Sequence, residues 1–148
     1  MNTRRLIRQD IDGLLDLYHH LHTDDDPIPP RPIVEAVWKE ISEADHFRYF
    51  GVFEKSLLVS SCTLSVIPNL TRRCRPYGVI ENVVTHADYR NHGYGKRVLD
   101  AALADAWMND CYKVLLSTGR KDEQTHKFYE SVGFDRKSKQ AFVAMPPK

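Results

Sequence analysis

The apolar residues of the first third of the chain recur at helical spacing. A short strand is expected over residues 3–8, followed by a helix from about Asp10 to His22. Prolines in the segment Asp24–Pro30 end that helix, because proline cannot continue the hydrogen-bond ladder. A second helix ends near Asp45, and its predicted apolar face consists of Ile33, Val34, Val37, Trp38 and Ile41.

Three strands are expected next, at residues 47–53, 57–67 and 78–85. The first is aromatic and β-branched, which is typical of a buried strand. The second half of the next strand alternates apolar with hydroxyl-bearing residues, which indicates that one face is packed. Residues 68–77 are predicted to be a loop that carries Arg72, Arg73 and Arg75.

A βαβ unit and a closing hairpin are predicted for the rest of the chain. The helix from Gly95 to Asn109 has an apolar stripe, including Trp107, and leads into a strand at Cys111–Ser117. Strands joined by such a crossover are parallel. A helix over 122–132 is capped by Gly133, and the last strands follow Phe134 and include Gln140–Met145. The pattern predicts one mixed α/β domain.

Composition and charge exclude several classes of function. The chain has 148 residues and a net charge of +1, so nothing favours nucleic acid or an anionic membrane as a partner. No apolar run is long enough to span a bilayer, and the N-terminus lacks the apolar core of a signal peptide. Cys62, Cys74 and Cys111 fit reduced thiols, so we expect a cytoplasmic protein.

A glycine loop between the third long strand and the following helix is the first candidate for chemistry. Gly93 and Gly95 allow close approach of a ligand, and the helix N-terminus offers unpaired N–H groups. Arg90 and Lys96 can add charge-assisted contacts to phosphate. From the glycines alone, a tight strand-to-helix turn without a ligand is an equally good interpretation.

Two motifs resemble those of the GNAT superfamily of N-acetyltransferases. The pattern Arg-x-x-Gly-x-Gly at residues 90–95, after a Val-Val strand, resembles the family's acetyl-CoA pyrophosphate loop. The sequence Phe-Tyr-Glu-Ser-Val-Gly-Phe at residues 128–134 resembles its Phe-Tyr-x-x-x-Gly-Phe motif. The resemblance covers nearly the whole chain. It implies a single domain over 1–148 with a mixed, mostly antiparallel sheet, a central parallel βαβ unit splayed for acetyl-CoA, helices on both faces, and a homodimer.

Within the superfamily, the chain is most similar to the branch of glucosamine 6-phosphate N-acetyltransferases. The segments Ile80–Val84, Cys111–Val114 and 128–130 carry this similarity. Asn82 stands where that branch has Asp, and Thr125 where it has Asn.

The resemblance also implies roles for individual residues. Glu81, the one carboxylate inside an apolar strand, is the candidate base, because burial would raise its affinity for protons; a carboxylate that is paired with Arg or faces solvent on an alternating strand is the alternative. Tyr129 matches the family's general acid, and a core tyrosine is the alternative. The amides of Val83 and Val84 would stabilise negative charge on the reacting carbonyl oxygen.

The remaining candidates bind the cofactor or the acceptor. The resemblance gives the acetyl-CoA contacts as Val83, Val84, Thr85, Arg90, Asn91, His92, Gly93, Tyr94, Gly95, Lys96, Thr125 and Phe128. The acceptor contacts are predicted to be Asn82, Arg72, Arg73 and Asp26. No metal site is expected, because the histidines near residue 20 fit a solvated helix end.

The predicted activity is transfer of acetyl from acetyl-CoA to a primary amine of a small molecule, either an amino sugar or an amino-acid-like compound. Two alternatives stay open. The acceptor is a protein or aminoacyl-tRNA amine, or the chain is an acyl-CoA-binding regulatory module without turnover.

Overall fold

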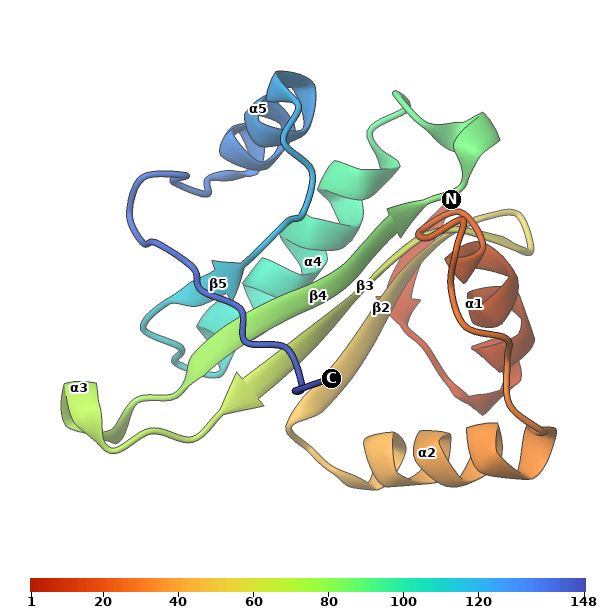
Figure 1. Ribbon diagram of the computed structural model, residues 1–148, viewed down its shortest axis with the longest axis horizontal. Helices are drawn as coiled ribbons and strands as arrows, with labels where there is room; N and C mark the ends of the chain where they lie inside the picture. The colour runs from red at the N-terminus through yellow and green to blue at the C-terminus, as the bar shows by residue number, and fades with distance from the viewer. The chain divides into compact units, whose positions relative to one another are not determined.

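A computed structural model describes residues 1–148 and divides them into two compact units, Met1–Leu116 and Ser117–Lys148. The first unit contains a five-stranded sheet in the order β1-β2-β3-β4-β5 (Figure 1). Its strands are β1 (Asn2–Arg5), β2 (Phe47–Glu54), β3 (Leu57–Ile67), β4 (Tyr77–Thr85) and β5 (Val114–Leu116). Only β4 and β5 are parallel, so the predicted mixed sheet with one parallel crossover is confirmed.

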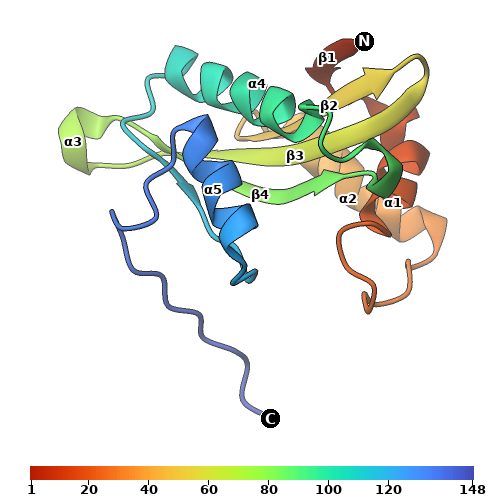
Figure 2. The ribbon, with the colours of Figure 1, turned by 90° about the horizontal axis from the view of Figure 1, so that it is seen from above.

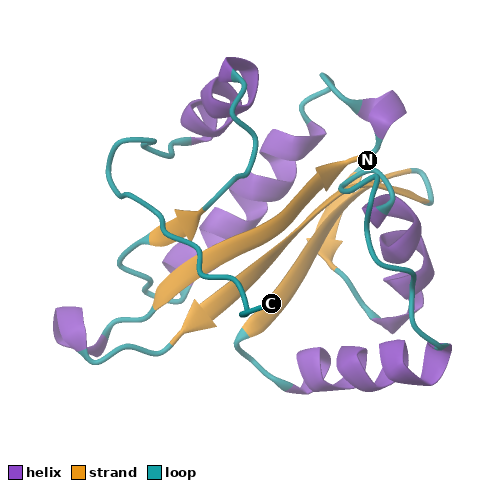
Figure 3. Ribbon diagram, viewed as in Figure 1, coloured by secondary structure: helices purple, strands orange, loops and turns teal.

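Helices cover both faces of this sheet, as predicted. Helix α4 (Tyr94–Met108) lies on one face, and α1 (Ile11–Tyr18) and α2 (Arg31–Glu43) lie on the other (Figures 2 and 3). Helix α4 buries small and branched side chains against the sheet, namely Val98, Leu99, Ala102 and Ala106. The core on the opposite face consists of Leu6, Ile11, Leu14, Leu17, Trp38, Phe53, Leu58 and Val84. Since each helix buries one stripe, both layers depend on burial of apolar area.

Strand β3 is packed on both faces, whereas the sequence predicted only one. Ser60 and Ser61 are fully buried, because helices lie above and below the middle of the sheet. Both hydroxyl groups have hydrogen-bond partners. Ser61 Oγ donates to the carbonyl of Phe50 at 2.8 Å, and Ser60 Oγ donates to the carbonyl of Val84 at 3.0 Å. Buried hydroxyls with such partners avoid the cost of desolvation.

Several predicted boundaries are wrong in the N-terminal half. The first strand ends at Arg5, because a 3-10 turn, η1 (Arg8–Asp10), precedes α1. Helix α1 ends at Tyr18 instead of His22. On α2 only Trp38 is buried, and Ile33 and Val37 are about half exposed. The predicted apolar face of α2 is therefore only partly used within this chain.

The arginine segment before β4 and the end of α4 also differ from prediction. Residues Thr71–Cys74 form one turn, α3, in which Arg72 and Arg73 have positive φ. At the end of α4, Trp107 is 52% exposed and so lies outside the buried stripe.

The second unit contains one helix and no strand. Helix α5 (Glu123–Val132) ends at Gly133, whose φ of 109° is the left-handed cap that the sequence predicted. The strands expected after Phe134 are wrong: residues 134–148 form none. Phe142 is 91% exposed and Val143 81%, so no neighbouring strand supports this segment. No helix in the structure is long and apolar enough to cross a bilayer.

Candidate active site

The sheet opens along one edge of β4. Strand β5 pairs with β4 only from Gly78 to Ile80, instead of along the whole predicted strand 111–117. Strand β4 then continues through Glu81–Thr85 without a partner strand on that side. Backbone polar groups along this edge are therefore available to an extended ligand, in the way that a peptide adds to a sheet.

A β-bulge lies at the point where the two strands separate. The register between β3 and β4 pairs Thr63 with Glu81 and Ser61 with Val84. Cys62 is therefore opposite two residues, Asn82 and Val83, and Asn82 has a φ of 51°. Asparagine is one of the few residue types that adopt this left-handed conformation readily. The bulge bends the strand and changes the direction of the side chains around it.

Hydroxyl groups on β3 hold the bulged strand from the opposite side. Thr63 Oγ1 donates to the carbonyl of Glu81 at 3.1 Å, and Ser60 Oγ is 2.9 Å from Thr85 Oγ1. Sequence reasoning missed this role, because it assigned Thr63 to the unpacked face of an alternating strand. A run of small hydroxyl residues in a central strand was the available signal.

Glu81, the candidate base, is exposed, so its predicted burial is wrong. It alternates with the buried Ile80, and the bulge leaves the next residue, Asn82, exposed as well. Its side chain therefore faces solvent, as the alternative interpretation had it. Its carboxylate is open to water and to a ligand beside the free edge of β4.

The glycine segment forms an open turn before α4. We call residues 86–96 the candidate phosphate loop. It contains the 3-10 turn η2 (Ala87–Tyr89) and the helix N-cap Gly93, whose φ is 80°. The first bond of α4 runs from Arg97 N–H to the Gly93 carbonyl at 3.0 Å, so three earlier N–H groups have no acceptor within the helix. A Cβ on Gly93 would meet nothing within 4 Å. This open helix N-terminus fits a pyrophosphate group.

The cations of the candidate phosphate loop have partners within the protein. Arg90 donates from Nε to the carbonyl of Thr85 and from Nη2 to the carbonyl of His20, both at 3.3 Å. Lys96 pairs with Asp100 at 3.5 Å, and both side chains are about half exposed. Arg90 therefore stabilises the loop itself, and both cations contribute positive charge beside the helix N-terminus.

Aromatic side chains connect the same loop to β2. Tyr94 donates from its hydroxyl to Glu54 at 2.9 Å, and this bond raises the pKa of Tyr94. The ring of His92 stacks on Tyr94 with centroids 6.1 Å apart, and His92 Nδ1 is 2.6 Å from the carbonyl of Arg90. Asn91 has a φ of 62° and helps to form the turn. The start of α4 is thus fixed to the sheet.

The second unit carries the other predicted site residues. Asp122 caps α5 by accepting from the amide and the hydroxyl of Thr125 at 2.9 and 2.8 Å. These bonds, with a smaller contribution from Arg120, lower the pKa of Asp122 to about 2. The ring of Tyr129 is 5.1 Å from that of Phe128 and meets Phe134 edge-on at 6.2 Å. Thr125 and Tyr129 are therefore on one short, well-capped helix.

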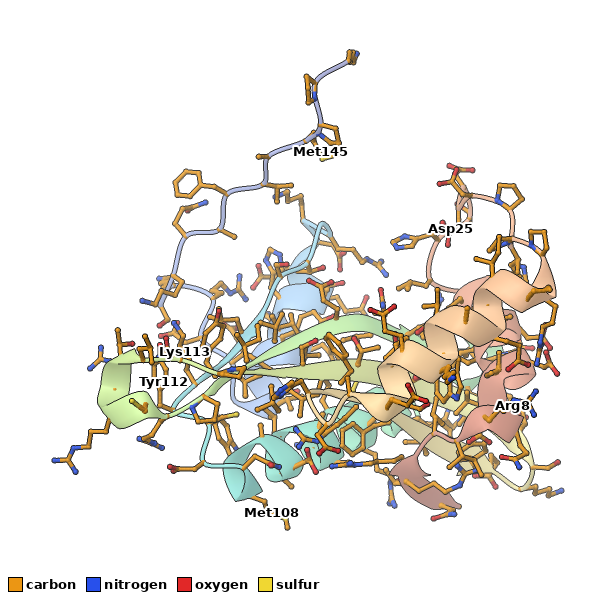
Figure 4. The ribbon with its side chains drawn as sticks, turned by 90° about the horizontal axis from the view of Figure 1, so that it is seen from below. Arg8, Asp25, Met108, Tyr112, Lys113 and Met145 are labelled. Carbon is orange, nitrogen blue, oxygen red and sulfur yellow. The ribbon has the colours of Figure 1, made fainter.

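The predicted acceptor residues are spread over the first unit. Arg72 and Arg73 lie before Tyr77, the first residue of β4. At the usual rise per residue, Glu81 lies about 13 Å along the strand from Tyr77, so these arginines are at the other end of the strand segment from Glu81. The Arg72 guanidinium is 5.8 Å from the ring of Tyr112. The ammonium group of Lys113 lies 5.1 Å from the same ring, and both Tyr112 and Lys113 are labelled in Figure 4. Asp26 is exposed in the segment between α1 and α2.

No group of three or more His, Cys, Asp or Glu side chains is arranged to hold a metal ion. The sequence predicted that the histidines near residue 20 form a solvated helix end. His20 instead contacts the candidate phosphate loop.

Comparison with known proteins identifies the family. The profile of the GNAT family of acetyltransferases matches residues 11–134. A glucosamine 6-phosphate N-acetyltransferase from Trypanosoma brucei is 31% identical over 141 residues, which cover 90% of this chain and 88% of that protein. A candidate acetyltransferase from Agrobacterium tumefaciens is 36% identical, with a TM-score of 0.91 over 98% of this chain and all of that one. The glucosamine-6-phosphate N-acetyltransferase of Arabidopsis thaliana, at 23% identity and a TM-score of 0.85 over 98% of each chain, shares the fold.

The chain therefore belongs to the GNAT family of acetyltransferases. It is an acetyl-CoA-dependent N-acetyltransferase with the GNAT fold, and the resemblance seen in its motifs is confirmed.

Proposed function

We propose that this chain transfers acetyl from acetyl-CoA to the primary amine of a small molecule by direct attack in a ternary complex, and that the acceptor is an amino sugar or an amino-acid-like compound. One observation carries the proposal: the free edge of β4 leads directly into an open helix N-terminus. An extended pantetheine arm and a pyrophosphate need these two features in this order. Relatives named for glucosamine 6-phosphate support an amino-sugar acceptor.

The residues of β4 have separate roles in this proposal. Acetyl-CoA, when bound, supplies an activated thioester. One backbone N–H of the pair Val83 and Val84, the one that faces the free edge, stabilises negative charge on its carbonyl oxygen. Glu81 accepts the proton of the amine, because an alkyl ammonium with a pKa of about 10 is neutral in only about one molecule in a thousand at pH 7. The exposure of Glu81 supports proton transfer through a water molecule.

The other assignments depend on the second unit and on the acceptor loops. Tyr129 donates a proton to the departing thiolate, and Thr125 and Phe128 contact the cofactor. Arg72 and Arg73 bind a phosphate or carboxylate of the acceptor, while Asn82 and Asp26 contact its polar groups. We propose one domain over residues 1–148, since the family match spans both units. The three free cysteines support a cytoplasmic location.

A thiol-release screen tests the acceptor class. The panel contains glucosamine 6-phosphate, glucosamine, amino acids, polyamines, aminoglycosides, a peptide with a free N-terminus and an aminoacyl-tRNA. We expect the highest kcat/KM with an amino sugar or an amino-acid-like compound. A preference for the peptide or the tRNA contradicts the small-molecule proposal. Tight binding of acetyl-CoA without thiol release across the whole panel indicates a regulatory module.

Replacing Glu81 tests the base. We expect Glu81→Gln to lower kcat/KM about 100-fold near pH 7, because general base catalysis contributes about that much. Activity should recover partly at alkaline pH, where more of the amine is neutral. Glu40→Gln, an exposed change on α2, is the control. Rates equal to wild type across the pH range would make Glu81 structural.

Replacing Tyr129 tests the acid. We expect Tyr129→Phe to lower kcat about 100-fold while the Kd of acetyl-CoA changes less than about threefold, because the ring contacts with Phe128 and Phe134 remain. Tyr112→Phe removes a hydroxyl without an assigned role and serves as control. A turnover number unchanged across pH would remove Tyr129 from this role.

We also propose that the chain forms a homodimer. Phe142, Val143 and Met145 are each at least 79% exposed in the single chain, and burial against a second copy would remove this apolar surface from water. Light scattering should give a mass of about two chains in solution, and substitution of Phe142 and Val143 by Ser should reduce it to that of one. A single-chain mass for the unmodified protein contradicts the dimer.

A further inference from the structure

The turn that follows α1 contacts the candidate phosphate loop through His20. Nδ1 of the imidazole accepts a hydrogen bond from Ala87 N–H at 3.3 Å, and the backbone carbonyl accepts from Arg90 Nη2 at 3.3 Å. The rings of His20 and His86 also lie against each other, with centroids 4.0 Å apart. Figures 1 and 2 both show the loop beside α1. His20 therefore holds the loop at three points from an element remote in sequence.

We propose that His20, in its neutral form, is a positioning residue for acetyl-CoA binding: it fixes the candidate phosphate loop so that the N-terminus of α4 stays open for the pyrophosphate. The inference rests on the proposed function of that loop. Arg90 connects the two segments, because one guanidinium spans the Thr85 carbonyl at the end of β4 and the His20 carbonyl in the turn after α1. The bond to Ala87 then fixes the start of η2, and together these bonds restrict the loop before the ligand arrives.

The imidazole bond requires one protonation state. Nδ1 accepts from Ala87 N–H only when it carries a lone pair, so the proton of neutral His20 must be on Nε2. Protonation at Nδ1 turns the acceptor into a donor that faces another donor. The contact is therefore present at neutral pH and is lost as the pH falls.

The charged groups around His20 set the pH at which this occurs. Desolvation, followed by the positive charge of His86 and Arg90 and a smaller effect of His19, lowers the pKa of His20, whereas Asp88 acts in the opposite direction. Because the pKa is lowered in the folded loop, neutral His20 persists below the ordinary value of about 6.5. Further acidification favours the loop without the Ala87 bond.

His86 has a related contact that the experiment must separate. Its Nδ1 accepts from Asp88 N–H at 3.2 Å and caps η2. This second imidazole contact remains in place when His20 alone is replaced. Only the part of a pH profile that disappears when His20 alone is changed belongs to His20.

The test measures CoA binding by calorimetry with three variants of the full chain. His20→Asn places an amide oxygen where Nδ1 was and cannot titrate, whereas His20→Phe keeps a ring beside His86 but has no acceptor. His19→Phe is the matched control, since His19 is exposed and its Nδ1 is hydrogen-bonded to the Asp16 carbonyl of α1, away from the candidate phosphate loop. NMR of the ligand-free protein follows the Ala87 amide and the His20 ring during acid titration.

We expect His20→Phe to weaken CoA about fivefold at pH 7.5, the effect of one lost hydrogen bond, while kcat at saturating substrates changes less than twofold. His20→Asn and His19→Phe should bind within twofold of wild type, and His20→Asn should lose part of the decline in affinity toward pH 5.5. The Ala87 amide should titrate with His20. Normal CoA binding by His20→Phe overturns the proposal and leaves the proposed function intact. Failure of wild type to bind CoA overturns both, and an Ala87 amide that does not follow His20 overturns the contact itself.

Discussion

The early end of the pairing between β4 and β5 is the constraint on which the site depends. Backbone groups in a sheet normally have partners on both sides, and leaving them without any is costly where water is excluded. Here the parallel pairing stops at Ile80, and β4 continues with one side unpaired. The cost is kept low because water reaches the free side beside the exposed Glu81 and Asn82, while Ser60 and Thr63 of β3 hold the paired side. A ligand that supplies amide groups along the free side completes the sheet.

The rest of the first unit gives this edge a fixed position. Helix α4 is held on the sheet by fully buried Val98 and Leu99, and its first turn is fixed to β2 by the bond from Tyr94 to Glu54. The opposite core, which includes Trp38 and Val84, supports β4 from the other face. A ligand can therefore bind along the edge of β4 through surface contacts, without any repacking of the protein core.

Periodicity and two motifs were sufficient to predict the fold class, the sheet order near the site and the cap at Gly133. Gly93 could be placed before α4 because the glycine pattern at residues 90–95 lies between a predicted strand and a predicted helix, whereas a role in cofactor binding required the resemblance to the family. Glu81 is exposed because it alternates with buried Ile80, but the apolar residues on both sides of it in the sequence do not show which face of β4 is packed. The contacts of His20 could not be predicted either, because its partners are distant in sequence and two of the bonds use backbone groups, the Ala87 N–H and the His20 carbonyl, which leave no residue pattern. The C-terminal segment has the composition of a strand, but a strand needs a neighbour, and composition does not supply one.

The left-handed backbone at Asn82 limits which residue types this position accepts. A β-branched or bulky residue there would cost about 1–2 kcal/mol before any effect on chemistry, so the residues that the fold accepts easily are Asn, Asp and Gly. The Asn found here and the Asp that the resemblance to the related branch implies at this position both belong to that small set. An exchange between Asp and Asn at position 82 can therefore replace a charge with a neutral amide while the backbone stays the same. With the acceptor contact proposed above for Asn82, such an exchange would change the acceptor site and leave the fold as it is.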